Sequence, residues 1–164
     1  MNVDPLSETI VEIQPVSLPL APVLAGIHAE CFGAEGWGID QMRGSLMLAT
    51  TQGWLAMADD QMAGFILCQV AGEESEVLTF CVRPAFRRQG VGESLVRHVQ
   101  NNLPLRGVVH LEVAADNTAA RGLYEKCGFA VINTRKDYYR REGKLADAVC
   151  YRYTAGEKTD NLQA

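Results

Sequence analysis

The sequence lacks several features that would assign the protein to a well-defined class. It has no run of about 18 apolar residues, so we expect no membrane-spanning helix. The first twenty residues contain no Lys or Arg, so the basic start of a secretory signal is missing. Its 5 cysteines form no C-x-x-C pair, which argues against zinc-binding and disulfide-rich scaffolds. These absences predict a cytoplasmic protein whose cysteines are small, buried core residues.

Apolar residues are abundant enough to form one folded domain. Of the 164 residues, 48% are hydrophobic and 21% are charged, which is the balance of a globular protein. The length corresponds to a single domain of ordinary size. We therefore expect one domain over residues 8–154, with flexible ends at 1–7 and 155–164.

The spacing of apolar residues predicts an order of strands and helices. The predicted strands are 10–16, 54–58, 63–70, 76–82, 108–114, 130–134 and 148–153. The predicted helices are 20–32, 40–49, 89–102 and 117–127, with Asp40 and Asn117 as N-caps. Because several strands precede the first strand–helix–strand unit, the sequence predicts a single-domain α/β fold around one mixed sheet.

Charge is divided unevenly along the chain. Residues 1–82 carry one basic residue against eleven acidic ones, a net −10, whereas residues 83–144 carry twelve basic against six acidic, a net +6. A basic second half favours an anionic ligand. The overall net charge of −5 argues against nucleic acid and for a small phosphorylated cofactor, which needs only a local basic patch. The simpler alternative to an anionic ligand is that the two halves have solvent-exposed faces of unequal charge without a binding role.

The segment 87–92, Arg-Arg-Gln-Gly-Val-Gly, lies between a predicted strand and a predicted helix. Unpaired N–H groups of a first helical turn, with the helix dipole, suit a phosphate. The two glycines let the backbone approach a ligand closely, and the two arginines add positive charge. Two other glycine loops are excluded, because the Lys-Ser/Thr of a Walker loop is missing and Leu95 stands where a dinucleotide-binding loop has its third glycine.

This Arg/Gln-x-x-Gly-x-Gly loop resembles the signature of the GCN5-related N-acetyltransferase (GNAT) superfamily, where it binds the pyrophosphate of acetyl-coenzyme A. The resemblance implies the acyl-CoA N-acyltransferase fold, a mixed and mostly antiparallel sheet flanked by helices. It implies acetyl-CoA as the acetyl donor. The cofactor-binding residues that it implies are Phe80, Cys81, Val82, Arg87, Arg88, Gln89, Gly90, Val91, Gly92, Glu93 and Asn117. The wide spacing of His28, His98 and His110 predicts no metal site.

A second block of residues is most similar to the RimI subfamily of ribosomal-protein N-terminal acetyltransferases. The matching residues are Leu111-Glu112-Val113, Asn117, Ala120, Leu123-Tyr124, Gly128-Phe129 and the run 135–139. The resemblance spans about residues 76–150. The chain departs from the pattern at Ala114, where the family commonly has Arg, and at 144–148, where an expected acidic position is missing. These departures concern peptide selectivity more than acetyl-CoA binding.

Acetyl transfer to an amine requires a base, and the resemblance assigns this role to Glu112. A free α-amino group has a pKa of about 7.7–8.0, so much of it is protonated near neutrality. On the predicted strand, Glu112 and His110 point to the face opposite Leu111. Partial withdrawal from water would favour proton uptake by the carboxylate. The alternation of residues by itself is also consistent with a solvent-exposed Glu112 that has no catalytic role. His110, which shares the same strand face, is an alternative base.

The resemblance assigns Tyr124 as the acid that protonates the departing thiolate of coenzyme A. A phenol remains protonated at neutral pH. Tyr124 also lies in an apolar helical stripe, so packing is the alternative role. By resemblance, backbone N–H groups of 80–82 stabilise the oxyanion. Asn117 is expected to cap its helix, to contact the cofactor, or both.

The resemblance implies an N-acetyltransferase acting on the N-terminal α-amine of a protein, such as a ribosomal protein. Within the same enzyme class, the alternative acceptor is a small-molecule amine. A non-catalytic acyl-CoA sensor is an alternative of another class, whereas a nucleotide-binding redox protein is disfavoured by the missing third glycine. The expected partners are acetyl-CoA and either a protein N-terminus or a small amine, with no nucleic acid and no membrane.

Overall fold

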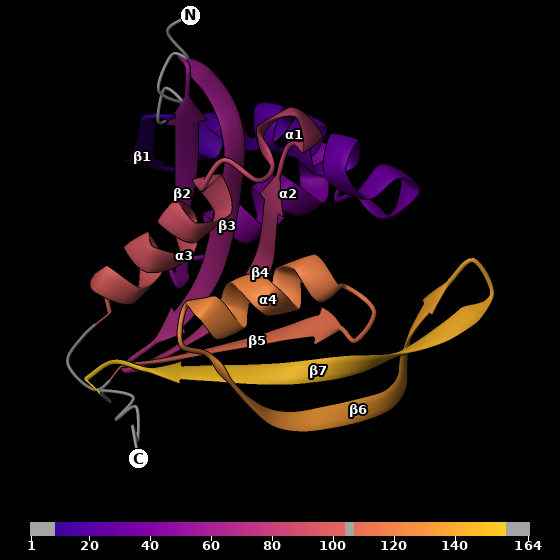
Figure 1. Cartoon of the computed structure of the whole chain (residues 1–164). Coiled ribbons are helices and arrows are strands. Elements are labelled where there is room, and N and C mark those ends of the chain that lie inside the picture. Colours follow the sequence, from indigo (N-terminus) through magenta and orange to yellow (C-terminus); the bar gives the residue numbers. More distant parts are fainter. Residues whose placement is uncertain (1–8, 104–106, 157–164) are drawn as a thin grey trace, which may run out of the picture.

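The computed structural model describes residues 9–103 and 107–156 (Figure 1), so the predicted flexible ends lie almost wholly outside the described residues. A seven-stranded sheet has the order β1-β2-β3-β4-β5-β7-β6. Its strands are β1 Val11–Pro15, β2 Thr51–Ala58, β3 Gln61–Ala71, β4 Glu74–Val82, β5 Val108–Ala114, β6 Ala130–Arg141 and β7 Lys144–Thr154. Only β4 and β5 are parallel neighbours; the other pairs are antiparallel. The predicted mixed, mostly antiparallel sheet is confirmed.

Helices cover both faces of the sheet. They are α1 Ala21–Phe32, α2 Ile39–Met47, α3 Val91–Asn101 and α4 Thr118–Lys126. Helices α3 and α4 pack on one face through a large apolar core that includes Leu95 and Tyr124, and α1 and α2 pack on the other through Leu24 and Met42 (Figure 1). No helix in the described part of the chain is both long enough and apolar enough to span a membrane.

Local sequence explains several boundaries. The β2–β3 hairpin turns at Asp59 and Asp60, whose positive φ values of 49° and 59° suit a tight two-residue turn. Helix α4 begins where the Asn117 side chain accepts a hydrogen bond from the Ala120 N–H at 3.2 Å, as its capping role predicted. Gly128 lies just beyond the end of the helix and has a left-handed conformation with a φ of +86°, which favours glycine.

The predicted boundaries of α2, β6 and β7 were wrong. Gly38 rather than Asp40 is the N-cap of α2, and Asp40 instead lies in the first helical turn, 3.5 Å from Arg43. The strands β6 and β7 are much longer than 130–134 and 148–153. Most of β6 is exposed, so its sequence lacks the apolar alternation by which a half-buried strand is recognised.

Candidate active site

The parallel strands β4 and β5 separate after a short contact. They pair only over 74–76 and 108–110, although both strands continue beyond it. Figure 1 shows the two strands diverging from this point. Their opened edges present backbone N–H and C=O groups that can pair with an extended ligand.

A register irregularity lies on β4 just beyond the start of this opening. Thr79 pairs with Leu67 and Val77 pairs with Cys68, so Leu78 is left outside the β3–β4 register. A bulge of this kind leaves one residue unpaired and redirects the backbone around it. The backbone donors predicted at 80–82 therefore lie close to a bulge at Leu78. The sequence pattern did not predict this bulge.

The loop before α3 gathers unpaired N–H donors. None of the backbone N–H groups of 88–93 has a hydrogen-bond partner within the described part of the chain. Arg88 and Gly90 have positive φ values of 64° and 83°, and alternation of this kind turns successive N–H groups toward one concave point. The Arg87 Nε donates to the Val82 carbonyl at 3.0 Å, which ties the loop to the end of β4. The arrangement suits a phosphate.

The other predicted cofactor-binding residues differ in what they can offer. The side chains of Val91 and Cys81 are buried, with exposures of 1% and 5%, so these residues present only backbone to a ligand. Glu93 is paired with Lys126 at 2.7 Å, which keeps its carboxylate engaged away from the loop. A Cβ on Gly92 would lie 3.1 Å from the end of the Leu123 side chain, so a larger residue here would require the Leu123 side chain to shift.

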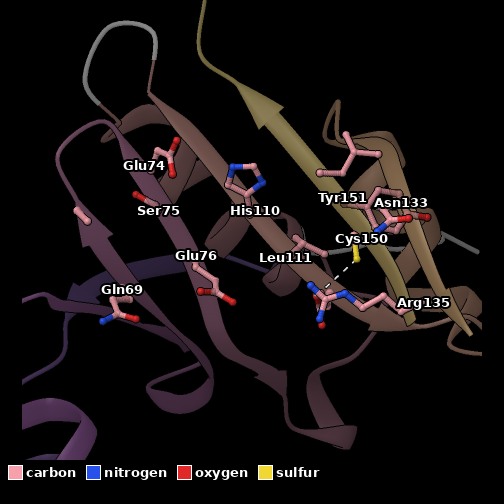
Figure 2. Close-up of a pocket in the computed structure, with 13 residues that line it drawn as sticks. Gln69, Glu74, Ser75, Glu76, His110, Leu111, Asn133, Arg135, Cys150 and Tyr151 are labelled. Carbon is pink, nitrogen blue, oxygen red and sulfur yellow. Dashed lines mark hydrogen bonds and ion pairs between the residues drawn. The ribbon is translucent and has the colours of Figure 1, made fainter. Parts of the chain in front are cut away.

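Glu112 lies in a pocket of about 410 Å³ at the start of the β4–β5 opening. The side chains of Glu76 on β4 and Arg135 on β6 extend into it from opposite sides (Figure 2). The Glu112 side chain is 27% exposed, and its Oε1 lies 3.3 Å from Arg135. The Cys150 thiol donates to the same oxygen at 3.5 Å. Its Oε2 has no such partner among the described residues.

The pocket confirms the predicted orientation of β5. His110 and Glu112 line it and are half-buried, whereas Leu111, which also borders it, is 3% exposed and belongs to the apolar core. Burial, and then the charge of Glu112, raise the pKa of Cys150, so this residue remains a thiol and a donor. The His110 alternative stays open on geometry, since both side chains reach the same cavity.

Tyr124 lies on the opposite face of the sheet, packed among aromatic rings. Its ring centroid is 6.2 Å from that of Phe80, 5.7 Å from Phe129 and 5.9 Å from Tyr151. Burial raises its pKa above the ordinary value, so the phenol stays protonated. Within the described part of the chain its hydroxyl has no hydrogen-bond partner. The contact with Phe80 brings it next to the opened strand β4.

Sequence reasoning did not single out Glu76 or Arg135, which line the pocket with Glu112. Arg135 belongs to a run that matched the RimI pattern, but nothing in its spacing indicated contact with β5. Asn117 caps α4 through its oxygen, which leaves its amide group free to donate to a ligand. In the described residues, no group of three His, Cys, Asp or Glu side chains could hold a metal ion.

Residues 24–129 match the acetyltransferase (GNAT) family. The chain belongs to this family. As a GNAT protein it is an N-acetyltransferase, and the fold and the RimI-like pattern predicted from its sequence are confirmed.

Curated relatives of this GNAT enzyme are similar over much of its length. The [ribosomal protein bS18]-alanine N-acetyltransferase of Escherichia coli K12 is 32% identical over 144 residues, or 86% of this chain and 93% of that protein. Its Salmonella typhimurium counterpart is 42% identical over 94 residues, which cover 64% of that protein. The Mycobacterium tuberculosis N-alpha-acetyltransferase RimI is 42% identical over 84 residues, 51% of each chain.

Two solved structures share the fold of this chain. The Escherichia coli ribosomal-protein-S18-alanine N-acetyltransferase superposes with a TM-score of 0.82 and 25% identity, covering 94% of this chain and 100% of that chain. Arabidopsis thaliana NAA60, solved in complex with acetyl-CoA, has a TM-score of 0.76 at 17% identity over 88% of this chain and 98% of its own, and so shares the fold.

Proposed function

We propose that this GNAT enzyme transfers the acetyl group of acetyl-CoA to the N-terminal α-amine of a protein, such as a ribosomal protein. The main support is the position of Glu112, whose carboxylate lines the pocket where β4 and β5 begin to separate. A thioester held between the strands would lie beside that carboxylate. Relatives named for acetylating the alanine of ribosomal protein bS18 favour an alanine α-amine as acceptor.

The fit of acetyl-CoA rests on the loop before α3. The unpaired N–H groups of 88–93 and the positive end of the helix would bind the pyrophosphate. Arg87 and Arg88 are exposed beside them and would add charge-assisted hydrogen bonds. The opened edge of β4 over 80–82 would pair with the pantetheine arm, and the amide of Asn117 would add a further contact. Acetyl-CoA supplies an acetyl group that is already activated as a thioester.

In the mechanism we propose, Glu112 prepares the acceptor. Its Oε1 is held by Arg135 and by the Cys150 thiol, whereas its Oε2 is left to take a proton from the ammonium group, directly or through a water. The neutral amine then attacks the acetyl carbon. Backbone N–H groups near the bulge at Leu78 and over 80–82 would stabilise the negative oxygen that develops.

Tyr124 would complete the transfer by protonating the departing thiolate. Its buried phenol keeps its proton throughout the neutral range and contacts Phe80 on β4. Protonation of the thiolate suppresses the reverse reaction, because a thiol is a poorer nucleophile than a thiolate.

The acceptor pocket favours a cationic substrate. Glu74, Glu76 and Glu112 line it, against one guanidinium, that of Arg135. Carboxylates in excess attract an ammonium group and suppress the binding of anionic acceptors. A protein N-terminus with basic residues close behind it fits this charge pattern.

The proposal is tested by offering acceptors to the purified enzyme with acetyl-CoA. The panel contains a peptide that begins with the N-terminal alanine of bS18, the same peptide already acetylated at its α-amine, and small amines including spermidine. We expect acetylation of the free peptide, with tandem mass spectrometry locating the group on the α-amine. The blocked peptide controls for acetylation of lysine side chains. Turnover of small amines with no reaction of the free peptide would contradict the proposal.

A further inference from the structure

Two cysteines from different elements meet at the end of β4. Cys31 lies in the last turn of α1, and Cys81 lies in β4. The Cys31 Sγ donates to the carbonyl oxygen of Val82, the residue after Cys81, at 3.5 Å. Cys31 also packs against the apolar cluster that contains Cys81, and each thiol shifts the pKa of the other. Cys31 is half-buried, whereas Cys81 is 5% exposed. An accessible thiol packed beside a buried one is the arrangement of a reactive cysteine and its resolving partner.

Electrostatics distinguish the two thiols. The hydrogen bond with Cys81, together with the positive charge of Arg87, lowers the pKa of Cys31, although burial and Glu30 oppose this. The hydrogen bond with Cys31, together with burial, raises the pKa of Cys81. Cys31 is therefore the thiol that ionises first, and the thiolate is the nucleophilic form.

The remaining cysteines offer a contrast within the same chain. Burial raises the pKa of the thiols of Cys68, Cys127 and Cys150, so these three cysteines stay protonated near neutral pH. Each is buried, and no disulfide joins any of the cysteines. The reactivity that we assign to Cys31 is thus a property of its position and not of cysteine in this fold.

We propose that Cys31 reacts with hydroperoxides and that Cys81 resolves the product, so that oxidation joins α1 to β4 through a disulfide. In the first step the Cys31 sulfur forms a bond to one peroxide oxygen, the O–O bond breaks, and the leaving hydroxide takes a proton to become water. The Cys81 sulfur then attacks the sulfenic sulfur, the S–O bond breaks, and the released hydroxide takes the Cys81 proton. Two thiols lose two electrons, and hydrogen peroxide is reduced to two waters.

The cross-link depends on the packing of Cys31 beside Cys81 at the end of β4 and not on acetyl transfer. Neither thiol group takes part in the mechanism proposed above. The cross-link would nevertheless join α1 to the strand that borders the proposed donor site. The cross-link is detected without any activity measurement. A negative result for the disulfide therefore leaves the proposed acetyltransferase function untouched, and the reverse also holds.

The test treats the protein with hydrogen peroxide, removes the peroxide, unfolds the protein in excess iodoacetamide so that every remaining thiol is blocked, and maps the digest by mass spectrometry. We expect a peptide pair linked through Cys31 and Cys81 that dithiothreitol separates. Cys31→Ser should abolish the link, and Cys81→Ser should stop the reaction at a sulfenic acid that dimedone traps on Cys31. Cys127→Ala, which alters a buried cysteine outside the pair, should form the link as the native protein does.

A second measurement needs no variant. At neutral pH, Cys31 of the native protein should react with iodoacetamide about tenfold faster than the buried thiol of Cys68, since alkylation follows thiolate content and access. Both cysteines recovered as free thiols after peroxide treatment would overturn the proposal. So would equal alkylation rates at Cys31 and Cys68.

Discussion

The candidate base and acid occupy very different surroundings. Glu112 is held in a polar pocket by Arg135 and Cys150, whereas Tyr124 is buried among aromatic rings on the other face of the sheet. The first environment places a carboxylate on a pocket that a cationic amine can enter. The second keeps a phenol neutral, because a phenolate without solvent is costly. Two groups that differ in this way can act as base and acid at the same pH.

Replacing Tyr124 by Phe keeps the ring and removes only the hydroxyl. We predict that kcat for peptide acetylation falls by about 10²-fold, the usual size of a general-acid contribution, while the Kd for acetyl-CoA is unchanged. Because burial raises the pKa of Tyr124, the native enzyme should show no loss of rate from its deprotonation below about pH 10. Steady-state kinetics across pH measure both effects.

The matched control is Tyr153→Phe, a half-buried tyrosine whose ring packs 5.5 Å from Phe129. It should keep the native kcat, since its hydroxyl has no part in the mechanism. If Tyr124→Phe also kept the native kcat, Tyr124 would be a packing residue only.

At the level of strands and helices, the proposed donor site is formed mainly by backbone groups rather than by side chains. The partial separation of β4 from β5 opens two strand edges, and the start of α3 adds unpaired N–H groups at the end of β4. Gly90 precedes α3 with a φ of +83°, and a Cβ there would meet nothing within 4 Å. A side chain at this position would therefore project into the space beside the N–H groups that we propose bind the pyrophosphate.

Gly90→Glu introduces a carboxylate at this point. We predict that its Kd for acetyl-CoA rises by about 100-fold or more, because like charges brought together cost several kcal/mol. Isothermal titration calorimetry measures the Kd directly. Gly90→Asn is the matched control, since asparagine tolerates a positive φ and carries no charge. Binding of acetyl-CoA by Gly90→Glu with native affinity would contradict the pyrophosphate assignment.

At the scale of the whole molecule, local pattern predicted the elements better than it predicted their contacts. The strand at 108–114, the capping of α4 by Asn117 and the face of Glu112 all follow from alternation and capping rules that act over a few residues. The early separation of β4 from β5 and the contact between Arg135 and Glu112 depend on pairing between distant segments. A single sequence carries no local trace of such contacts.

The family resemblance supplied what local rules could not. It identified the fold and the N-acetyltransferase class, which are confirmed, and it assigned Glu112 and Tyr124 to catalysis, which stays a prediction. The pair formed by Cys31 and Cys81 falls outside both kinds of reasoning. Each cysteine alone is an ordinary core residue, and only the packing of α1 against β4 brings the two thiols together.

The measurement that tests the account most directly is the kcat of Glu112→Gln on the alanine peptide, determined together with the Kd for acetyl-CoA. Glutamine keeps the size of the side chain but cannot accept the proton of an ammonium group. The account predicts that kcat falls by about 10²–10⁴-fold with the Kd unchanged, while Glu12→Gln on the distant edge strand β1 keeps the native rate. A native kcat in Glu112→Gln would contradict the account.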